Sequence, residues 1–288
     1  MTDRPGPNAH PVGGPHFEPH ARAASPGAPA APRRAPGEPA VVVLTGAAFT
    51  IAAVEWVARH GARAALDVHA RERMTEARDV VRGLVERGEI VYGVTTGFGD
   101  LATTFIPPAD AARLQENLLM SHAAGVGPAF PREVVRAMLL LRHSGCRPEL
   151  VDRLCAFLRV GIHPVVPEQG SVGASGDLAP LAHLALPIVG RGQVELGGAV
   201  MPAMVALRES GLEPLVLEPK EGLALLNGTQ LMSALGALLL ADADRLGRTA
   251  SVVAAMSVEA LLGTEVAYAA PYQLARPHHG QVAVAAEL

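Results

Sequence analysis

The chain has 288 residues, of which 49% are hydrophobic, 18% charged and only 3% aromatic. A chain of this length forms one or two domains, and aliphatic side chains must fill most of its core. Its net charge of -4 argues against a nucleic acid or an anionic membrane as partner.

The predicted elements begin only after a Pro-rich N-terminal segment. Residues 1–40 hold ten of the 24 prolines and show little apolar periodicity, which predicts a disordered tail. The segment also lacks the apolar region of a signal peptide, so we expect a cytoplasmic protein. Two cysteines in apolar helical contexts, Cys146 and Cys155, indicate buried free thiols in a reducing compartment.

The remaining sequence is rich in alanine, leucine and arginine, which are good helix formers, and this predicts an all-α fold. Apolar side chains recur at helical spacing in most segments. We expect helices at 49–60, 68–87, from 108 to about 122, 132–142, 148–160, 178–189, 221–246 and 249–262, the last two largely buried. A brief extended run is expected at 90–92 and a small hairpin at 193–201.

The most informative stretch is the glycine-rich run at 170–178, which contains Ala174-Ser175-Gly176. In a tight turn, the amide nitrogen of Gly176 can attack the carbonyl carbon of Ala174 and close a five-membered ring. Loss of water from that ring and from the Ser175 side chain leaves a methylene group conjugated to an imidazolone. No ordinary side chain is an electrophile of this kind, and enzymes that need one usually bind a cofactor.

Other functions of a glycine-rich turn fit this run less well. A phosphate-binding P-loop would end in Gly-Lys-Ser/Thr, which is absent, and a nucleophile elbow needs glycine at the position of Asp177. A plain surface loop is the alternative for the triplet alone, because glycine and serine favour turns. Asp177 itself fits the N-cap of the helix that follows it.

The flanks of the triplet resemble the signature of the aromatic amino acid ammonia-lyases, most closely their histidine ammonia-lyase branch. Several long segments resemble that family in the expected order, and together they cover about residues 41–288. These segments are 92–99, 117–127, 167–186, 220–230 and 276–281.

The resemblance implies an all-α helical bundle of the aromatic amino acid lyase type, similar to fumarase and aspartase, with a small β element. It implies an N-terminal lyase domain at 41–220 and the start of a central helical bundle at 221–288. It also implies that Ala174, Ser175 and Gly176 form a methylidene-imidazolone, so that no external cofactor is needed. The implied reaction is the non-oxidative elimination of ammonia from L-histidine, which gives trans-urocanate.

His122 lies four residues after Leu118 and eight after Leu114, so the three share one helical face. A lone histidine on an apolar face is usually a satisfied core residue. In the histidine-specific branch, however, a Ser-His pair stands at this place and its histidine contacts the substrate ring. The pair Ser121-His122 therefore favours L-histidine, because a buried imidazole nitrogen needs a polar partner.

Tyr92, Asn227 and Gln230 are the other candidate site residues. Tyr92 resembles the loop tyrosine that closes the family's active site and is a candidate base; its alternative is an ordinary tyrosine at a strand end. Asn227 and its neighbour Gly228 both cost helix propensity, which indicates a role beyond packing, and by resemblance Asn227 lies near the imidazolone and the substrate. Gln230 is a second candidate for substrate binding, with a satisfied core amide as its alternative.

We expect no metal, because the adjacent residues His278 and His279 project apart and no third ligand is evident. The resemblance implies a homotetramer whose active sites combine residues from several subunits. We expect neither a nucleic acid nor a membrane as partner.

The chain departs from the family pattern in several places. It stops at Leu288 within a family segment, without the C-terminal half that supplies another tyrosine, a carboxylate-binding arginine and a glutamate. The connection at 142–145 is shorter than in the family, and His279 stands where proline is usual. Thr95 resembles the phenylalanine and tyrosine branches.

Two classes of function therefore stay open: an active lyase, completed by a separate chain that carries the missing half, or a non-catalytic fragment or assembly partner of a full-length lyase. A tyrosine or phenylalanine ammonia-lyase or an aminomutase is the lesser alternative. We expect weak or no activity from this chain alone, because it lacks the carboxylate-binding arginine.

Overall fold

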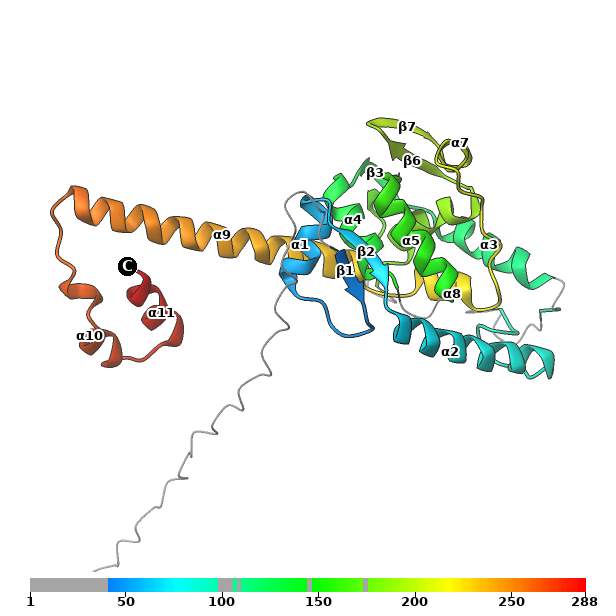
Figure 1. Ribbon diagram of the computed structural model, residues 1–288, viewed down its shortest axis with the longest axis horizontal. Helices are drawn as coiled ribbons and strands as arrows, with labels where there is room; N and C mark the ends of the chain where they lie inside the picture. The colour runs from blue at the N-terminus through cyan, green and yellow to red at the C-terminus, as the bar shows by residue number, and fades with distance from the viewer. Residues whose placement is uncertain (1–40, 98–105, 108–109, 144–146, 173–175) are drawn as a thin grey trace, which may run out of the picture. The chain divides into compact units, whose positions relative to one another are not determined.

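Helices form most of the described chain, as the sequence predicted (Figure 1). The computed structural model describes residues 41–97, 106–107, 110–143, 147–172 and 176–288. The tail predicted at 1–40 and Cys146 lie outside these residues. The helices are α1 Ile51–Arg59, α2 Val68–Glu86, α3 Ala111–His122, α4 Arg132–Leu141, α5 Pro148–Val160, α6 Leu178–Ala185, α7 Ala203–Glu209, α8 Glu221–Leu226, α9 Gln230–Ala260, α10 Ala270–Leu274 and α11 His279–Glu287, with 3-10 turns at η3 Leu186–Val189 and η4 Val266–Tyr268.

Several helix ends follow local signals in the sequence. α5 begins at Pro148, whose fixed φ suits a first helical turn, and stops at Gly161, which is left-handed with a φ of 82°. At the start of α2, the carboxylate of Asp67 accepts hydrogen bonds from the amides of His69 and Ala70 at 3.0 and 3.1 Å. These signals lie within a few residues of the helix ends, so the sequence alone indicates where such helices begin or stop.

Short strands form three small sheets among the described residues, more β structure than the sequence predicted. The strands pair as β1 (Val41–Leu44) parallel to β2 (Arg63–Leu66), β3 (Val126–Ala129) antiparallel to β5 (Pro167–Gln169), and β4 (His163–Pro164) beside the hairpin of β6 (Gln193–Leu196) and β7 (Ala199–Pro202). The hairpin is the one predicted at 193–201. The remaining strands pair with segments distant in sequence, so periodicity within one strand does not reveal them.

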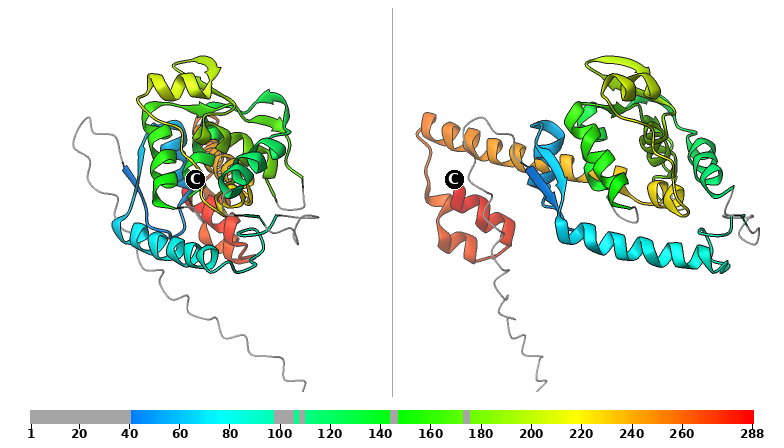
Figure 2. Two further views of the ribbon diagram at one scale, coloured as in Figure 1. Left: turned by 90° about the vertical axis from the view of Figure 1, so that its right-hand side faces the viewer. Right: turned by 45° about the vertical axis from the view of Figure 1, so that its right-hand side comes forward.

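The core lies around α4 and α5. In α4, every residue from Val134 to Leu140 is buried, and Phe157 of α5 and Leu119 of α3 are fully buried in the same cluster. α1 packs on α4, and α9 packs on both of them (Figure 1, Figure 2). Aliphatic side chains fill this core at the close packing typical of protein interiors, as the low aromatic content predicts.

Arg136 of α4 is a buried cation that binds neutral acceptors. It donates hydrogen bonds to the carbonyl oxygens of Val57 and Leu158 at 2.9 and 3.2 Å, and to Nε2 of His163 at 3.2 Å. Burial, together with the charges of Arg136 and Arg132, lowers the pKa of His163 to about 4. His163 is therefore neutral at neutral pH, as an acceptor for Arg136 must be.

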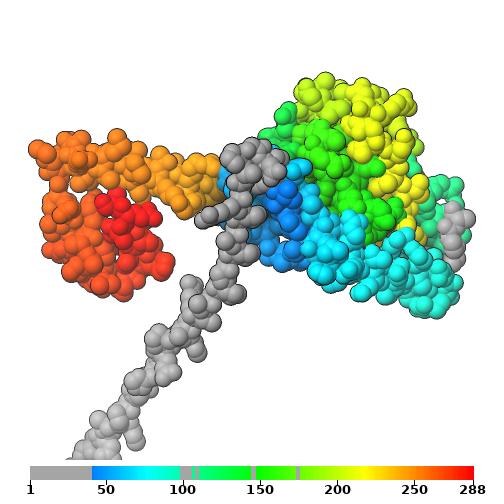
Figure 3. All heavy atoms as spheres, in the orientation of Figure 1, coloured from blue at the N-terminus to red at the C-terminus, as the bar shows by residue number. Residues whose placement is uncertain are grey.

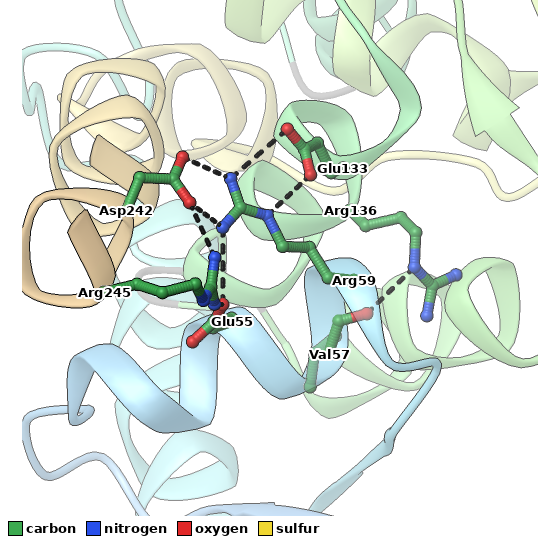
Figure 4. Close-up of polar contacts among 7 residues, drawn as sticks. All are labelled: Glu55, Val57, Arg59, Glu133, Arg136, Asp242 and Arg245. Carbon is green, nitrogen blue, oxygen red and sulfur yellow. Dashed lines mark hydrogen bonds and ion pairs between the residues drawn. The ribbon is translucent and has the colours of Figure 1, made fainter. Parts of the chain in front are cut away.

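An ion-pair network joins α9 to α1 and α4 (Figure 4). Arg59, at the end of α1, donates to Glu133 of α4 at 2.6 Å and to both carboxylate oxygens of Asp242 of α9 at 2.6 and 2.8 Å. Arg245 of α9 binds Asp242 and also Glu55 of α1. The Arg59 side chain is 18% exposed, whereas Glu133 and Asp242 are 40% and 49% exposed, so water screens much of the attraction within this network.

Two helix predictions for the C-terminal part are wrong. The helix expected at 221–246 breaks at 227–229, so that α8 ends at Leu226 and α9 begins at Gln230. α9 then continues to Ala260 through the gap predicted at 247–248. Apolar periodicity missed both features, because hydrophobic residues continue on both sides of the break and the residues at 247–248 are exposed on a regular helix.

The second half of α9 also differs from the buried helix that the sequence predicted. None of residues 241–260 is buried, and Figure 3 shows this stretch, in orange, open on the face towards the viewer. Large apolar side chains are among the exposed ones: Leu246, Val252, Val253 and Met256. Across the described residues, no helix combines the length and the apolar character needed to cross a membrane.

Candidate active site

Gly176 is held against the break between α8 and α9. Its backbone forms a parallel bridge with Gly228 and an antiparallel bridge with Val172. The amide of the next residue, Asp177, donates to the carbonyl oxygen of Gly228 at 2.9 Å. The predicted catalytic residues Ala174 and Ser175 lie outside the described residues, so the structure places the triplet through its last member.

Only glycine fits at position 176. Its φ is 82°, a conformation that residues with a Cβ atom rarely adopt. A Cβ atom would lie 2.5 Å from the carbonyl oxygen of Gly228 and 2.9 Å from Cγ2 of Thr229. The predicted ring closure uses the amide nitrogen of this residue, so the fold fixes the backbone that carries the reacting atom.

The glycine-rich residues 170–176, which end with the triplet, are called the electrophile segment below. Asp177 is fully buried and connects this segment to α9. Its carboxylate accepts hydrogen bonds from Oγ of Ser171 at 2.8 Å and from the amides of Leu231 and Met232 at 2.9 and 3.1 Å. Leu231 and Met232 stand in the first turn of α9, where backbone amides have no partner within the helix. Asp177 therefore caps α9 across the fold.

The sequence predicts Asp177 as the N-cap of the helix that follows it, and Asp177 does hold that position: its backbone carbonyl oxygen accepts from the amide of Leu181 at 2.9 Å. Its side chain, however, makes no capping bond to α6. A local pattern identifies a residue type that caps helices, but it cannot reveal a helix that begins far along the chain. The negative charge is also favourable at the N-terminus of α9, where the helix dipole is positive.

Asn227 and Gln230, the candidate substrate-binding amides, flank the same break. Asn227 follows α8 in an extended conformation and is exposed, so it does not lie within a helix as the sequence predicted. Gln230 is the first residue of α9. Its Oε1 is buried and has no hydrogen-bond partner within the described structure, and an acceptor in that state costs free energy until a ligand or water binds it.

His122 is half-buried at the end of α3. Its Nδ1 lies 2.9 Å from the carbonyl oxygen of Leu118 and 3.1 Å from Oγ of Ser121. A carbonyl oxygen only accepts hydrogen bonds, so Nδ1 carries a proton, and the lone pair of the neutral ring lies on Nε2. In that form the ring is an acceptor for an N–H donor.

Tyr92 opens a turn that two buried threonines hold in place. Thr95 Oγ1 accepts a hydrogen bond from the amide of Val91 at 2.8 Å, and Thr96 Oγ1 accepts one from the amide of Gly93 at 3.3 Å. Tyr92 is 61% exposed, and no strand forms at 90–92. The sequence drew attention to Thr95 only as a branch marker, whereas the structure gives it a part in shaping the turn.

The structure thus gathers three of the predicted site residues, Gly176, Asn227 and Gln230, around one helix break. His122 connects to the same region through the backbone: α3 leads into β3, which pairs with β5, and β5 leads into the electrophile segment. For Tyr92 the structure fixes the turn on which it lies, and its place relative to a substrate stays a prediction. The contact of Asp177 with α9 could not be predicted from the sequence, because no local signal marks a contact with a distant helix.

Two other kinds of site find little support among the described residues. Burial raises the pKa of the free thiol of Cys155 to about 11, so this thiol is protonated at neutral pH and is a poor nucleophile. No group of three or more His, Cys, Asp or Glu side chains in the described part of the chain could hold a metal ion. His278 and His279 stand at the start of α11.

Comparison with known proteins points to one family. A family model described as aromatic amino acid lyase matches residues 49–288. The histidine ammonia-lyase of Gloeobacter violaceus is 50% identical over 254 residues, covering 86% of this chain and 49% of that protein. The histidine ammonia-lyase of Deinococcus radiodurans is 52% identical over 239 residues, covering 81% of this chain and 46% of that protein.

Solved structures with this fold include the same class of enzyme. The histidine ammonia-lyase of Trypanosoma cruzi superimposes with a TM-score of 0.79 and 40% identity, covering 86% of this chain and 49% of that one. The tyrosine aminomutase of Streptomyces globisporus superimposes with a TM-score of 0.80 and 36% identity, covering 87% of this chain and 48% of that one. The chain spans about half the length of the relatives it matches, and the predicted helical lyase fold is confirmed.

Proposed function

Because this chain belongs to the aromatic amino acid lyase family, we propose that it takes part in the elimination of ammonia from L-histidine to give trans-urocanate. The observation that carries the proposal is the anchoring of Gly176, the last member of the electrophile triplet, in a conformation that only glycine adopts readily. The histidine ammonia-lyases among its relatives support the choice of substrate.

The described residues fit a methylidene-imidazolone formed from Ala174-Ser175-Gly176. Val172 and Gly176 pair with each other, so the two ends of this short segment lie side by side, as the tight turn needed for ring closure requires. On the C-terminal side of the triplet, the side chain of Asp177 accepts hydrogen bonds from backbone amides of α9. When formed, the group supplies the electrophile that ordinary side chains lack.

Recognition of the substrate ring is assigned to His122. With the proton on Nδ1, its Nε2 can accept a hydrogen bond from an imidazole N–H, a match that a phenyl ring cannot provide. Asn227 and Gln230 lie on either side of Gly228 in the sequence, and Gly176 pairs with Gly228; this supports the proposal that they bind polar groups of the amino acid. Tyr92, on its exposed turn, is the candidate that closes the site and removes the β-proton.

The test is formation of urocanate from L-histidine, followed by its ultraviolet absorbance, with L-tyrosine and L-phenylalanine as competing substrates. We expect Ser175→Ala to abolish any turnover and His122→Leu to reduce the preference for L-histidine at least about tenfold, the value of one specific hydrogen bond to a buried group. Turnover that survives Ser175→Ala would refute the self-made electrophile. A preference for L-tyrosine would instead support a tyrosine ammonia-lyase or an aminomutase.

A second candidate function is assembly with another lyase chain, and the exposed apolar side chains on the second half of α9 favour it. Leu246, Val252 and Met256 are each at least 60% exposed on one helix, and exposed apolar patches of this kind mark interaction surfaces. We propose that 221–288 begins the central helical bundle and that α9 associates with like helices in a homo-oligomer or with a complementing chain. Light scattering on the chain alone and with a full-length histidine ammonia-lyase distinguishes these cases.

A further inference from the structure

His183 of α6 contacts the segment that follows His122. The amide of Gly125 donates a hydrogen bond to Nε2 of His183 at 3.1 Å. Gly125 comes three residues after His122, and His183 comes six residues after Asp177. The imidazole of His183 therefore connects α6, which follows the electrophile segment, to the backbone that follows His122, the candidate for binding the substrate ring.

The direction of this hydrogen bond fixes the state of the His183 ring. A backbone amide can only donate, so Nε2 of His183 carries no proton, and the ring is the neutral form with its proton on Nδ1. Burial lowers the pKa of His183, which keeps the ring in this form at neutral pH. A protonated ring would present an N–H group to the Gly125 amide, and the contact would be lost.

The backbone around Gly125 has no spare room. A Cβ atom at Gly125 would lie 3.1 Å from Nε2 of His183 and 3.2 Å from Cβ of Pro167, and one at Gly170 would lie 3.2 Å from Cα of Gly125. Gly125 and Gly170 are the residues next to the pair formed by Val126 of β3 and Gln169 of β5. Gly125 is thus held on one side by the strand that enters the electrophile segment and on another by His183.

We propose that His183 is a positioning residue: by holding the Gly125 amide, it sets the place of His122 relative to the electrophile segment. His183 acts through His122 and is assigned no contact with the substrate. The consequence for recognition of L-histidine rests on the function proposed above, whereas the placement of His122 does not. The β3–β5 pairing keeps this region folded without His183, so we expect loss of His183 to change ring recognition more than overall folding.

The contact itself can be tested in the unaltered chain. We expect a scalar coupling between the amide nitrogen of Gly125 and Nε2 of His183 in a nitrogen-labelled, deuterated sample at neutral pH. An observed Gly125 amide without this coupling would overturn the proposal. This measurement needs neither turnover nor a folded variant.

The positioning role is tested with His183→Gln, His183→Leu and the control His69→Leu, which removes an exposed histidine of α2. Glutamine offers an acceptor to the Gly125 amide and leucine does not. We therefore expect His183→Leu to shift the ring resonances of His122, His183→Gln to restore them largely, and the control to leave them unchanged. Unchanged His122 resonances in a folded His183→Leu would contradict the positioning role.

Binding of L-histidine then separates this inference from the proposed function. We expect His183→Leu to weaken binding of L-histidine about fivefold to tenfold, and to have no further effect in a His122→Leu background, because the two residues act in series. Equal losses in both backgrounds would mean that His183 acts independently of His122. If the unaltered chain binds no L-histidine while the His122 resonances still respond to His183, the proposed function fails and the positioning role stands.

Discussion

A methyl group at position 176 would lie 2.5 Å from the Gly228 carbonyl oxygen, on a backbone with a φ of 82°. We predict that Gly176→Ala lowers the free energy of unfolding by about 3 kcal/mol, since it combines left-handed strain with overpacking. The matched control is Gly198→Ala in the β6–β7 hairpin. Gly198 has a φ of 89°, and no atom lies within 4 Å of the position that an added methyl group would take, so only the strain of about 1 kcal/mol remains. Urea denaturation measures both, and equal losses would contradict the close contact at Gly176.

His163 gives the stability of the chain a defined pH dependence. Its pKa falls from an ordinary value of 6.5 to about 4 in the folded state, so between these values the unfolded chain binds a proton that the folded chain does not. The contribution of neutral His163 to stability is therefore fully present above pH 6.5 and is lost as the pH falls towards 4, by up to about 3 kcal/mol.

The variant His163→Gln should remove the part of the slope that His163 contributes, because glutamine does not titrate; His183, whose pKa burial also lowers, keeps its own part. Denaturation midpoints at several values between pH 7.5 and 4.5 check this, with His69→Gln as the control at an exposed site. A slope as steep in His163→Gln as in the unaltered chain would assign the pH dependence to other groups.

Asp177 connects two helices: it precedes α6 in the chain, and its carboxylate caps α9. We predict that Asp177→Ala lowers the free energy of unfolding by about 3 kcal/mol, because it leaves buried amides of α9 and the Ser171 hydroxyl without their acceptor. Asp67→Ala is the matched control, since Asp67 caps two amides of α2 in the same way at a less buried site, and should cost about 1 kcal/mol. A loss at Asp177 no greater than that at Asp67 would contradict its role between the two helices.

The Arg59 network fixes α9 at a second place, further along the helix (Figure 4). We predict that Arg59→Ala lowers the melting temperature by a few degrees, because Glu133 loses its partner and Asp242 keeps only Arg245. Arg248→Ala, which removes an exposed pair with Asp244 in the same helix, should change the melting temperature little. Thermal melts followed by circular dichroism compare the two, and a similar effect of both variants would contradict a special role for Arg59.

These elements show which features a sequence predicts and which it does not. α5 was predicted from Pro148 to Val160 because its start and stop signals are adjacent to the helix. The break at 227–229 was missed, although Asn227 and Gly228 both disfavour a helix, because the apolar pattern resumes after it. The capping of α9 by Asp177 and the approach of Gly125 to Gly170 are contacts between distant segments, which local patterns cannot encode.

For the whole molecule, the sequence identified the reactive triplet, and the fold supplied the setting that the triplet needs. The electrophile segment leaves β5, ends at Gly176 and enters α6, while α9 begins beside it. Gly176 pairs with the α8–α9 break, Asp177 caps α9, and β3 connects the region to His122. The predicted residues thus belong to one region because three long-range contacts bring their elements together.

The intact mass of the purified chain tests the central claim most directly. We predict a mass lower than the encoded one by two water molecules, with the loss confined to the proteolytic peptide that contains Ala174-Ser175-Gly176 and absent in Ser175→Ala. The full encoded mass in a folded chain would contradict the claim that this fold makes its own electrophile.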